Sequence, residues 1–331
     1  YRLAMLVSGG LALILADQWL GWPATYRLMG GLFVLFALVS LWAPRLERPA
    51  TPSADVRREL RGFVAMLVAG GLAWWVFRSL PWGGLEANRF GALAVQTLGM
   101  LAAFAVAIRA ARWAGFPSFI APWDAFFSRE RAVALLALIV LYKLGDAFAG
   151  SLSTTFLIRG AGFTQTEVGA VNKVLGLAAT IVGALAGGAW LVRQPLYRAL
   201  MLFGLLQAVS NFGYWLLSVL PQNHALMAAA IGFENLCGGM GTAAFVAFLM
   251  ALTDQRFSAA QFALLSALSA VGRVYVGPAA GVMVEAFGWP VFFLWTVGAA
   301  LPGLLLLWWL RTTIEDLSSA KKTQDSTETS P

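Results

Sequence analysis

The sequence predicts an all-α polytopic membrane protein with about ten transmembrane helices, and three observations lead to this prediction. Hydrophobic residues make up 60% of the 331 positions and charged residues only 12%, so a soluble domain would lack the polar surface to cover its core. Apolar runs of roughly 20 residues recur along the chain, and a helix of that length crosses a bilayer. Many of the 14 Trp lie near the ends of these runs, as in an interfacial aromatic belt.

The apolar runs are separated by short turns and by two longer polar connections, 44–60 and 109–130. The second connection has room for a short interfacial helix. The final segment, 311–331, is rich in Ser and Thr, and we expect a disordered tail there. The expected spans are 1–16, 24–43, 61–80, 88–108, 131–157, 167–191, 198–219, 224–252, 261–286 and 289–310.

The net charge of +7 does not indicate nucleic-acid binding, because its placement follows the positive-inside rule. Fifteen basic residues fall in one set of loops, and only Arg27, Arg78, Arg89 and Arg159 fall in the opposite set. This asymmetry places the first set of loops and the C-terminal tail in the cytoplasm. Cys237 and His224 are the only residues of their types, so disulfides, zinc sites and Cys/His catalysis are unavailable. We expect no cofactor, no metal and no enzymatic activity.

An internal repeat predicts the architecture. Arg2 precedes Gly10 by eight residues and the sequence GWP follows at 21–23; Arg273 precedes Gly281 by eight residues and GWP follows at 288–290. The second copy follows four spans, whereas nothing precedes the first. Two equivalent halves of six helices are the architecture of the major facilitator superfamily. On that register about four and a half helices are missing before Tyr1, and the present spans are helices five to twelve plus an inserted pair.

This register divides the chain into four parts. Residues 1–43 would be the end of an N-terminal half, namely helix 5, truncated, and helix 6. Residues 44–130 would be cytoplasmic linkers with the inserted helix pair at 61–108, which we expect at the periphery. Residues 131–310 would be the C-terminal six-helix half, and 311–331 the disordered cytoplasmic tail.

Six ionisable residues fall inside the expected spans, where each costs about 2.5–3.5 kcal/mol and therefore requires an explanation. They are Arg2, Lys143, Asp146, Lys173, Glu234 and Arg273. On the proposed register they occupy helices 5, 7, 8, 10 and 11, which line or flank the central path of this fold. None occupies the outward helices or the inserted pair. This distribution indicates a water-filled transport path.

The spacing within the helices refines this prediction. Lys143, Asp146, Gly150 and Ser153 share one helix face. In the span 167–191, a stripe of small residues predicts close packing between helices. In the span 198–219, a stripe of polar residues is interpreted as contacts between helices outside the cavity. The small-residue stripe is Asn172, Gly176, Thr180, Gly183 and Gly187. The polar stripe is Gln207, Asn211, Tyr214 and Ser218. Gly238, Gly239 and Gly241, which follow Glu234, permit bending or tight approach.

Two interpretations of these charges remain open. Lys143 and Asp146 either neutralise each other at i, i+3 or serve transport. Glu234 and Arg273 lie at similar depth on neighbouring helices, as a static pair or as a gate. Six aromatic residues offer stacking surfaces for sugars, although packing is the favoured explanation: Phe148, Phe156, Tyr214, Trp215, Phe233 and Tyr275.

Several long segments resemble the AmpG-type muropeptide permeases of Gram-negative inner membranes. They are LYKLGDAF at 141–148, TTFLIRG at 154–160, EVGAVNK at 167–173, FENLCGGMG at 233–241, QFALLSALSAVGRVYVGP at 261–278 and YRLAMLVSGG at 1–10. The resemblance covers 1–43 and 131–310. On this resemblance we expect three departures from the family: the first four helices and any proton-binding carboxylate on them would be missing, 61–108 would match no part of the family, and a polar tail would replace the further helices of some relatives.

The resemblance implies a monomeric proton symporter in the inner membrane. It would import N-acetylglucosaminyl-1,6-anhydro-N-acetylmuramyl peptides from periplasm to cytoplasm, for peptidoglycan recycling and β-lactamase induction. Its partners would be the glycopeptide, protons and the lipid bilayer, and not nucleic acid. Cationic side chains would bind the peptide carboxylates, and Asp146 or Glu234 would carry protons. The expected substrate or proton pathway comprises Arg2, Lys143, Asp146, Asn172, Lys173, Glu234, Asn235, Arg273 and Tyr275.

Other functions were weighed against this one. A major facilitator transporter of another bulky anion, such as a nucleotide or a coenzyme A derivative, is the main alternative. A membrane-embedded glycosyl- or acyltransferase would need a catalytic motif on a loop, and Asp55, Glu59 and Asp124 form none. A membrane sensor that shares the fold without transporting is the third alternative.

Overall fold

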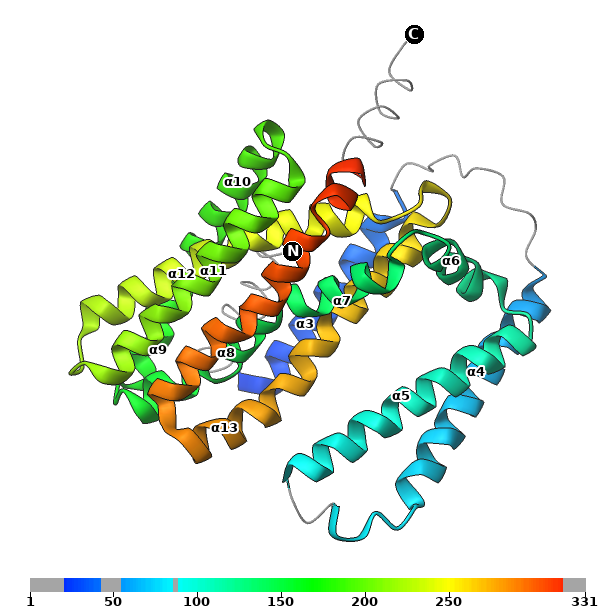
Figure 1. Ribbon diagram of the computed structural model, residues 1–331, viewed down its shortest axis with the longest axis horizontal. Helices are drawn as coiled ribbons and strands as arrows, with labels where there is room; N and C mark the ends of the chain where they lie inside the picture. Colours follow the sequence, from blue (N-terminus) through cyan, green and yellow to red (C-terminus); the bar gives the residue numbers. More distant parts are fainter. Residues whose placement is uncertain (1–20, 43–54, 86–88, 318–331) are drawn as a thin grey trace. The chain divides into compact units, whose positions relative to one another are not determined.

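The computed structural model describes residues 21–42, 55–85 and 89–317 (Figure 1). These ranges contain helices and turns and no strand, so the predicted all-α polytopic membrane class is confirmed. Eight helices in the described ranges are long and apolar enough to cross a membrane. The expected span 1–16 lies outside the described residues. The chain forms two compact units, one ending at Ala54 and one beginning at Asp55.

In the first unit, helix α3 (Gly21–Ser40) begins at the predicted Gly-Trp-Pro signal. Gly21 has a φ of +70°, a conformation that favours glycine. The second copy of this signal has the same geometry, since Gly288 has a φ of +77° and interrupts helix α13 (Ser258–Trp309). The glycine thus starts a new helix in both copies, and the local equivalence predicted by the repeat is present.

The second unit begins with two long helices that pack against each other, α4 (Val56–Ser79) and α5 (Arg89–Trp113). The side chain of Asp55 caps α4 by accepting a hydrogen bond from the backbone N–H of Arg57 at 3.1 Å. Small residues bring the pair close, because a Cβ at Gly70 would lie 3.1 Å from that of Ala107. Helix α5 also contacts α6 (Pro117–Phe127) and α13. Helix α6 is the short helix for which the 109–130 connection had room.

The remaining chain forms a bundle whose helices match the predicted spans from residue 131 to 310. Figure 1 shows α13 turning back on itself in its orange part, so that its two arms correspond to the two spans expected at 261–286 and 289–310. The helices before it are α7 (Ala132–Tyr142), α8 (Leu144–Thr155), α9 (Gln165–Val171), α10 (Leu177–Arg193), α11 (Leu196–Val219) and α12 (His224–Ala251). Two π-helical turns extend them, η4 (Phe156–Gly160) after α8 and η5 (Asn172–Gly176) between α9 and α10.

The predicted small-residue stripe packs α10 tightly against α12. A Cβ on Gly183 would overlap the backbone carbonyl oxygen of Leu236, and one on Gly187 would lie 2.8 Å from the Cα of Met240. Gly239 on α12 approaches the α10 backbone just as closely, since a Cβ there would overlap the Thr180 carbonyl oxygen. The predicted close packing is therefore present at Gly183, Gly187 and Gly239.

Buried polar side chains hold the turn between α12 and α13. Gln261 is buried, accepts from the backbone N–H of Asp254 at 2.6 Å and donates to the carbonyl of Pro122 in α6 at 2.9 Å. The Asp254 carboxylate in turn accepts from the backbone and guanidinium of Arg256, and these hydrogen bonds lower the pKa of Asp254. The turn and α6 are thereby joined.

The expected disordered tail requires a correction at its start. Residues 311–317 are helical, and Ile314 is fully buried in a hydrophobic cluster that contains Leu310. Leu310, Ile314 and Leu317 recur at helical spacing, so burial of their apolar side chains offsets the polarity of the neighbouring residues. The rest of the predicted tail lies outside the described residues.

Candidate functional site

Lys143 lies at an interruption between two helices. Helix α7 ends at Tyr142, α8 begins at Leu144, and Lys143 has φ −97° and ψ 3°. The apolar run predicted at 131–157 corresponds to the candidate membrane span Ala132–Gly160, within which this interruption separates α7 from α8. The interruption contains no proline, but Gly145 follows two residues later, and a Cβ there would lie 3.0 Å from that of Ala300 in α13.

The contacts of the Lys143 side chain form an ion pair extended by an amide. The Lys143 ammonium donates to the Asp146 carboxylate at 3.0 Å and to the Gln207 carbonyl oxygen at 3.2 Å. The Lys143 and Asp146 side chains are only 14% and 23% exposed. A charge-assisted pair in such surroundings is screened far less than one on the surface. The i, i+3 pair predicted from the sequence is thus present, with an additional partner on α11.

Glycines on α12 make room for this cluster. A Cβ on Gly241 would lie 2.6 Å from the Gln207 Oε1 and 3.6 Å from the Lys143 Nζ. At Gly238, one turn earlier, the nearest atom to a Cβ would be the Gln207 Nε2 at 3.5 Å, an ordinary contact. Gly241 is therefore the position at which a side chain would push Gln207 away from Lys143.

Glu234 anchors a second cluster that joins three helices. Its carboxylate accepts from the Tyr214 hydroxyl on α11 at 3.5 Å and from the Asn235 amide at 3.1 Å. The Asn235 carbonyl oxygen accepts from Thr180 on α10 at 3.0 Å. No basic side chain among the described ones lies within ion-pair distance of Glu234, although the charges of Asp146 and Lys143 act on it from farther away.

The α11 stripe belongs to both clusters, and we had assigned it only a structural role outside the cavity. Gln207 contacts Lys143, Tyr214 contacts Glu234, and both side chains are buried. The sequence signal was present, because four polar residues at helical spacing on an apolar helix need polar partners. The missing information was the rotation of α11, which turns the stripe toward α8 and α12.

The other predicted site residues are placed less centrally. Asn172 and Lys173 begin the π-helical turn η5, where Lys173 is exposed and Asn172 half-buried. Both Asn172 and Asn235 face Gly176, since its Cβ would lie 3.5 Å from the Asn172 Oδ1 and 3.2 Å from the Asn235 Nδ2. Single π-helical turns are frequent at functional sites.

Three predicted residues lie outside the description. Arg2 lies outside the residues that the structure describes, and for Arg273 and Tyr275 it describes the helical backbone but not the side chain. The neighbouring Gly272 faces α7 and α8, because its Cβ would lie 3.7 Å from Val140 and 3.9 Å from Leu144. The pairing of Glu234 with Arg273 stays a prediction.

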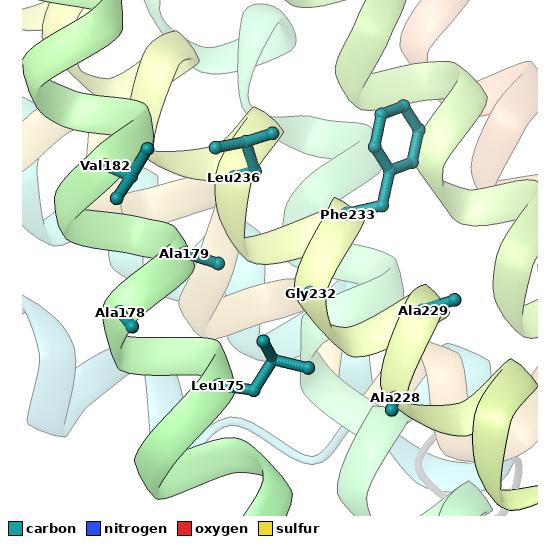
Figure 2. A pocket seen from close by; sticks show the side chains of 9 residues that line it. All are labelled: Leu175, Ala178, Ala179, Val182, Ala228, Ala229, Gly232, Phe233 and Leu236. Atoms are coloured by element: carbon teal, nitrogen blue, oxygen red, sulfur yellow. The ribbon is translucent and has the colours of Figure 1, made fainter.

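The aromatic residues mostly pack, as favoured from the sequence. Phe156 and Tyr214 are buried and both contact Phe293, Tyr214 by stacking and Phe156 edge to face. Phe233 differs, because it is 41% exposed and lines a groove of about 570 Å³ between α10 and α12. Figure 2 shows only apolar side chains along this groove, so it lacks the charged and polar groups of the two clusters. No group of three or more potential metal ligands occurs in the described part of the chain.

Comparisons with known proteins place the chain among transporters. It is 50% identical over 315 residues to "Anhydromuropeptide permease" of Escherichia coli strain K12, which covers 95% of this chain and 52% of the relative. "Putative transporter AmpG 4" of Rickettsia conorii is 36% identical over 195 residues, 59% of this chain and 47% of the relative. "Putative transporter AmpG 1" of Rickettsia prowazekii is 32% identical over 182 residues, 55% and 41% respectively.

The chain spans about half the length of the curated relatives it matches. No family model matches it. The relatives are named as permeases or transporters, which are not enzymes, and the described helices are those of a multi-pass membrane protein. The resemblance predicted from the sequence is therefore confirmed, the alignment with the E. coli relative extends over 95% of the chain, and the chain belongs to the AmpG-type permeases.

Proposed function

We propose that this chain is part of a proton-driven importer of anhydromuropeptides in the bacterial inner membrane, serving peptidoglycan recycling and β-lactamase induction. The name of the E. coli relative supports the substrate class, because half of the aligned residues are identical. The transporter would act as a monomer, with its C-terminus in the cytoplasm. Its substrate partners would be a glycopeptide and protons.

One observation carries this proposal, the Lys143–Asp146–Gln207 cluster within a membrane-spanning bundle. A muropeptide presents peptide carboxylates, and an ammonium in weakly screened surroundings attracts them strongly. Asp146 competes with the substrate for Lys143 in the resting arrangement. Protonation of Asp146 would weaken that ion pair and release Lys143 to a substrate carboxylate, which would couple proton binding to substrate binding.

The predicted pathway residues extend this cluster. Glu234 and Asn235 lie on α12, Asn172 and Lys173 precede α10, and Arg273 and Tyr275 lie on α13. Arg2 would complete the path from the N-terminal half. Residues 1–43 would belong to that half, 131–310 would form the C-terminal half, and the pair α4 and α5 within 44–130 would lie outside the transport path.

The test is uptake of radiolabelled anhydromuropeptide by membrane vesicles containing the full-length protein, from a strain that lacks its own muropeptide permease. We expect uptake to rise when the outside is acidified and to stop when an uncoupler dissipates the proton gradient. Excess unlabelled anhydromuropeptide should compete, whereas nucleotides and coenzyme A should not. Competition by a nucleotide would favour the bulky-anion alternative, and uptake indifferent to the gradient would refute symport.

A further inference from the structure

The face of α11 that carries Gln207 and Tyr214 also carries a buried side-chain amide, Asn211, to which neither cluster provides a hydrogen-bond acceptor. The Asn211 side chain is 1% exposed, and its amide nitrogen Nδ2 has no hydrogen-bond partner among the residues that the structure describes. Nearly all buried polar groups in proteins are hydrogen-bonded, to protein or to ordered water, so an exception requires a specific explanation. The small Ser210 nearby is different, because its buried hydroxyl donates to the backbone carbonyl of Gln207 at 2.8 Å.

Asn211 lies between the two clusters. It follows Gln207 by four residues and precedes Tyr214 by three, which places it on their helix face. At about 1.5 Å per residue, it is roughly 6 Å along the axis from Gln207 and roughly 4.5 Å from Tyr214. Gln207 contacts the Lys143–Asp146 pair, and Tyr214 contacts Glu234 and neighbours the Ser153 hydroxyl of α8. The unsatisfied amide thus lies between Gln207, which binds the Lys143 ammonium, and Tyr214, which binds the Glu234 carboxylate.

We propose that Asn211 binds a buried water molecule that connects the two clusters, and that α11 thereby carries a proton path between Glu234 and Asp146. The amide donates to the water oxygen, and the water donates to the polar groups on either side. Buried water typically makes about three such hydrogen bonds to groups that are otherwise unsatisfied. The path deepens the proposed function, since it rests on proton coupling.

The step is a proton transfer and consumes no other reactant. An O–H bond of the Glu234 carboxyl breaks, the Tyr214 hydroxyl and then the bound water each accept one proton and release another, and an O–H bond forms at Asp146; Asn211 only holds the water in place. Glu234 becomes a carboxylate, and Asp146 becomes a carboxylic acid that releases Lys143. The described titratable groups near this path are Lys143, Asp146, Tyr214, Glu234 and Cys237.

The water site is tested without transport, by hydroxyl-radical footprinting under X-ray radiolysis of the full-length protein. Radicals formed from a bound water label the side chain beside it even when bulk solvent has no access. We expect Tyr214, which is 2% exposed, to be labelled at least fivefold faster than the equally buried Phe248. Asn211→Leu should abolish this excess, whereas the control Ser210→Ala should preserve it.

Equal labelling of Tyr214 and Phe248 in the wild type would overturn the water site. So would an excess that persists in Asn211→Leu. Asn211→Val, which is smaller, is measured in parallel, so that a folding defect of the Leu variant does not prevent the decision. The proposal requires the excess to disappear in each variant that reaches the membrane.

The proton path is tested by comparing two transport modes of the same variant. Exchange of labelled for unlabelled anhydromuropeptide needs no net proton movement, whereas accumulation against a gradient does. We expect Asn211→Leu to keep exchange within about twofold and to lose proton-driven accumulation at least tenfold. Equal loss of both modes, or of neither, would overturn the path. Absence of exchange in the wild type would instead refute the proposed function, and footprinting would still decide the water site.

Discussion

Helix α12 has two unlike interfaces. Toward α10 it presents Gly239, whose hydrogen lies against backbone, and it receives Gly183 and Gly187 from the other helix. Toward α11 and α8 it presents Glu234, which binds Tyr214, and Gly241, which leaves room for Gln207 and Lys143. The first interface is packed by backbone and small residues, and the second contains carboxylates, an ammonium and amides.

The difference follows from the bilayer as a solvent. Lipid tails are as apolar as leucine, so helices associate through close packing and interhelical hydrogen bonds. The glycine interface uses the first of these and fixes how α10 and α12 approach each other. The α11 interface uses the second, and its charged groups are available for chemistry. We therefore expect substitutions at the first to affect mainly folding and at the second mainly transport.

The largest effect is expected from a large side chain in the glycine interface. Gly183→Leu would place its Cβ on the Leu236 carbonyl oxygen, and a backbone atom cannot rotate away. Overpacking of this kind costs about 1–3 kcal/mol or more. Fluorescence-detected size exclusion should show little monodisperse protein. Gly188→Leu, one residue beyond the Gly187 contact and facing open space, is the matched control and should resemble the wild type.

Removal of the Lys143 charge should come next. Lys143→Met deletes the hydrogen bonds to Asp146 and Gln207, each charge-assisted and worth about 1.5–3 kcal/mol. Thermal stability should fall, and anhydromuropeptide uptake should drop at least 100-fold. Combining Lys143→Met with Asp146→Asn should recover the melting temperature without recovering uptake. Recovery of uptake in the double variant would show that the pair is only structural.

A smaller effect is expected where one methyl group meets the polar cluster. Gly241→Ala would place its Cβ 2.6 Å from the Gln207 Oε1, so the amide must move off Lys143. Uptake should fall about three- to tenfold at nearly unchanged stability. Gly238→Ala on the same helix meets Gln207 only at 3.5 Å and should transport normally. Equal uptake by the two variants would refute a role for the Lys143–Gln207 contact.

The smallest effect lies outside both interfaces, at Asp254. Its hydrogen bonds to Arg256 lower the pKa of the carboxyl, so the folded state favours the carboxylate. The resulting stabilisation is present above the ordinary Asp pKa of about 3.9 and is lost as the pH falls through the lowered folded-state pKa. Asp254→Ala should lower the melting temperature slightly at pH 7 and not at pH 2. If the melting temperature of Asp254→Ala stays below that of the wild type at pH 2, the carboxylate charge is not the source of the stabilisation.

Much of the fold was predictable because the bilayer imposes local rules on the sequence. The thickness of the hydrocarbon core sets the length of an apolar run, so the spans from 131 to 310 match the observed helices within a few residues. Gly21 and Gly288 begin helices because their backbone conformation favours glycine. The small-residue stripe of α10 and the Lys143–Asp146 pair follow from helical periodicity alone.

Other features depend on how the helices are rotated and on which groups then meet. Lys143 bonds Gln207 of α11, Gln207 and Tyr214 belong to the charged clusters rather than to an outer contact, and Ile314 is buried in an expected tail. In each case the free energy comes from a partner distant in the chain. Periodicity identifies the face on which a residue lies, whereas only tertiary packing decides what that face contacts.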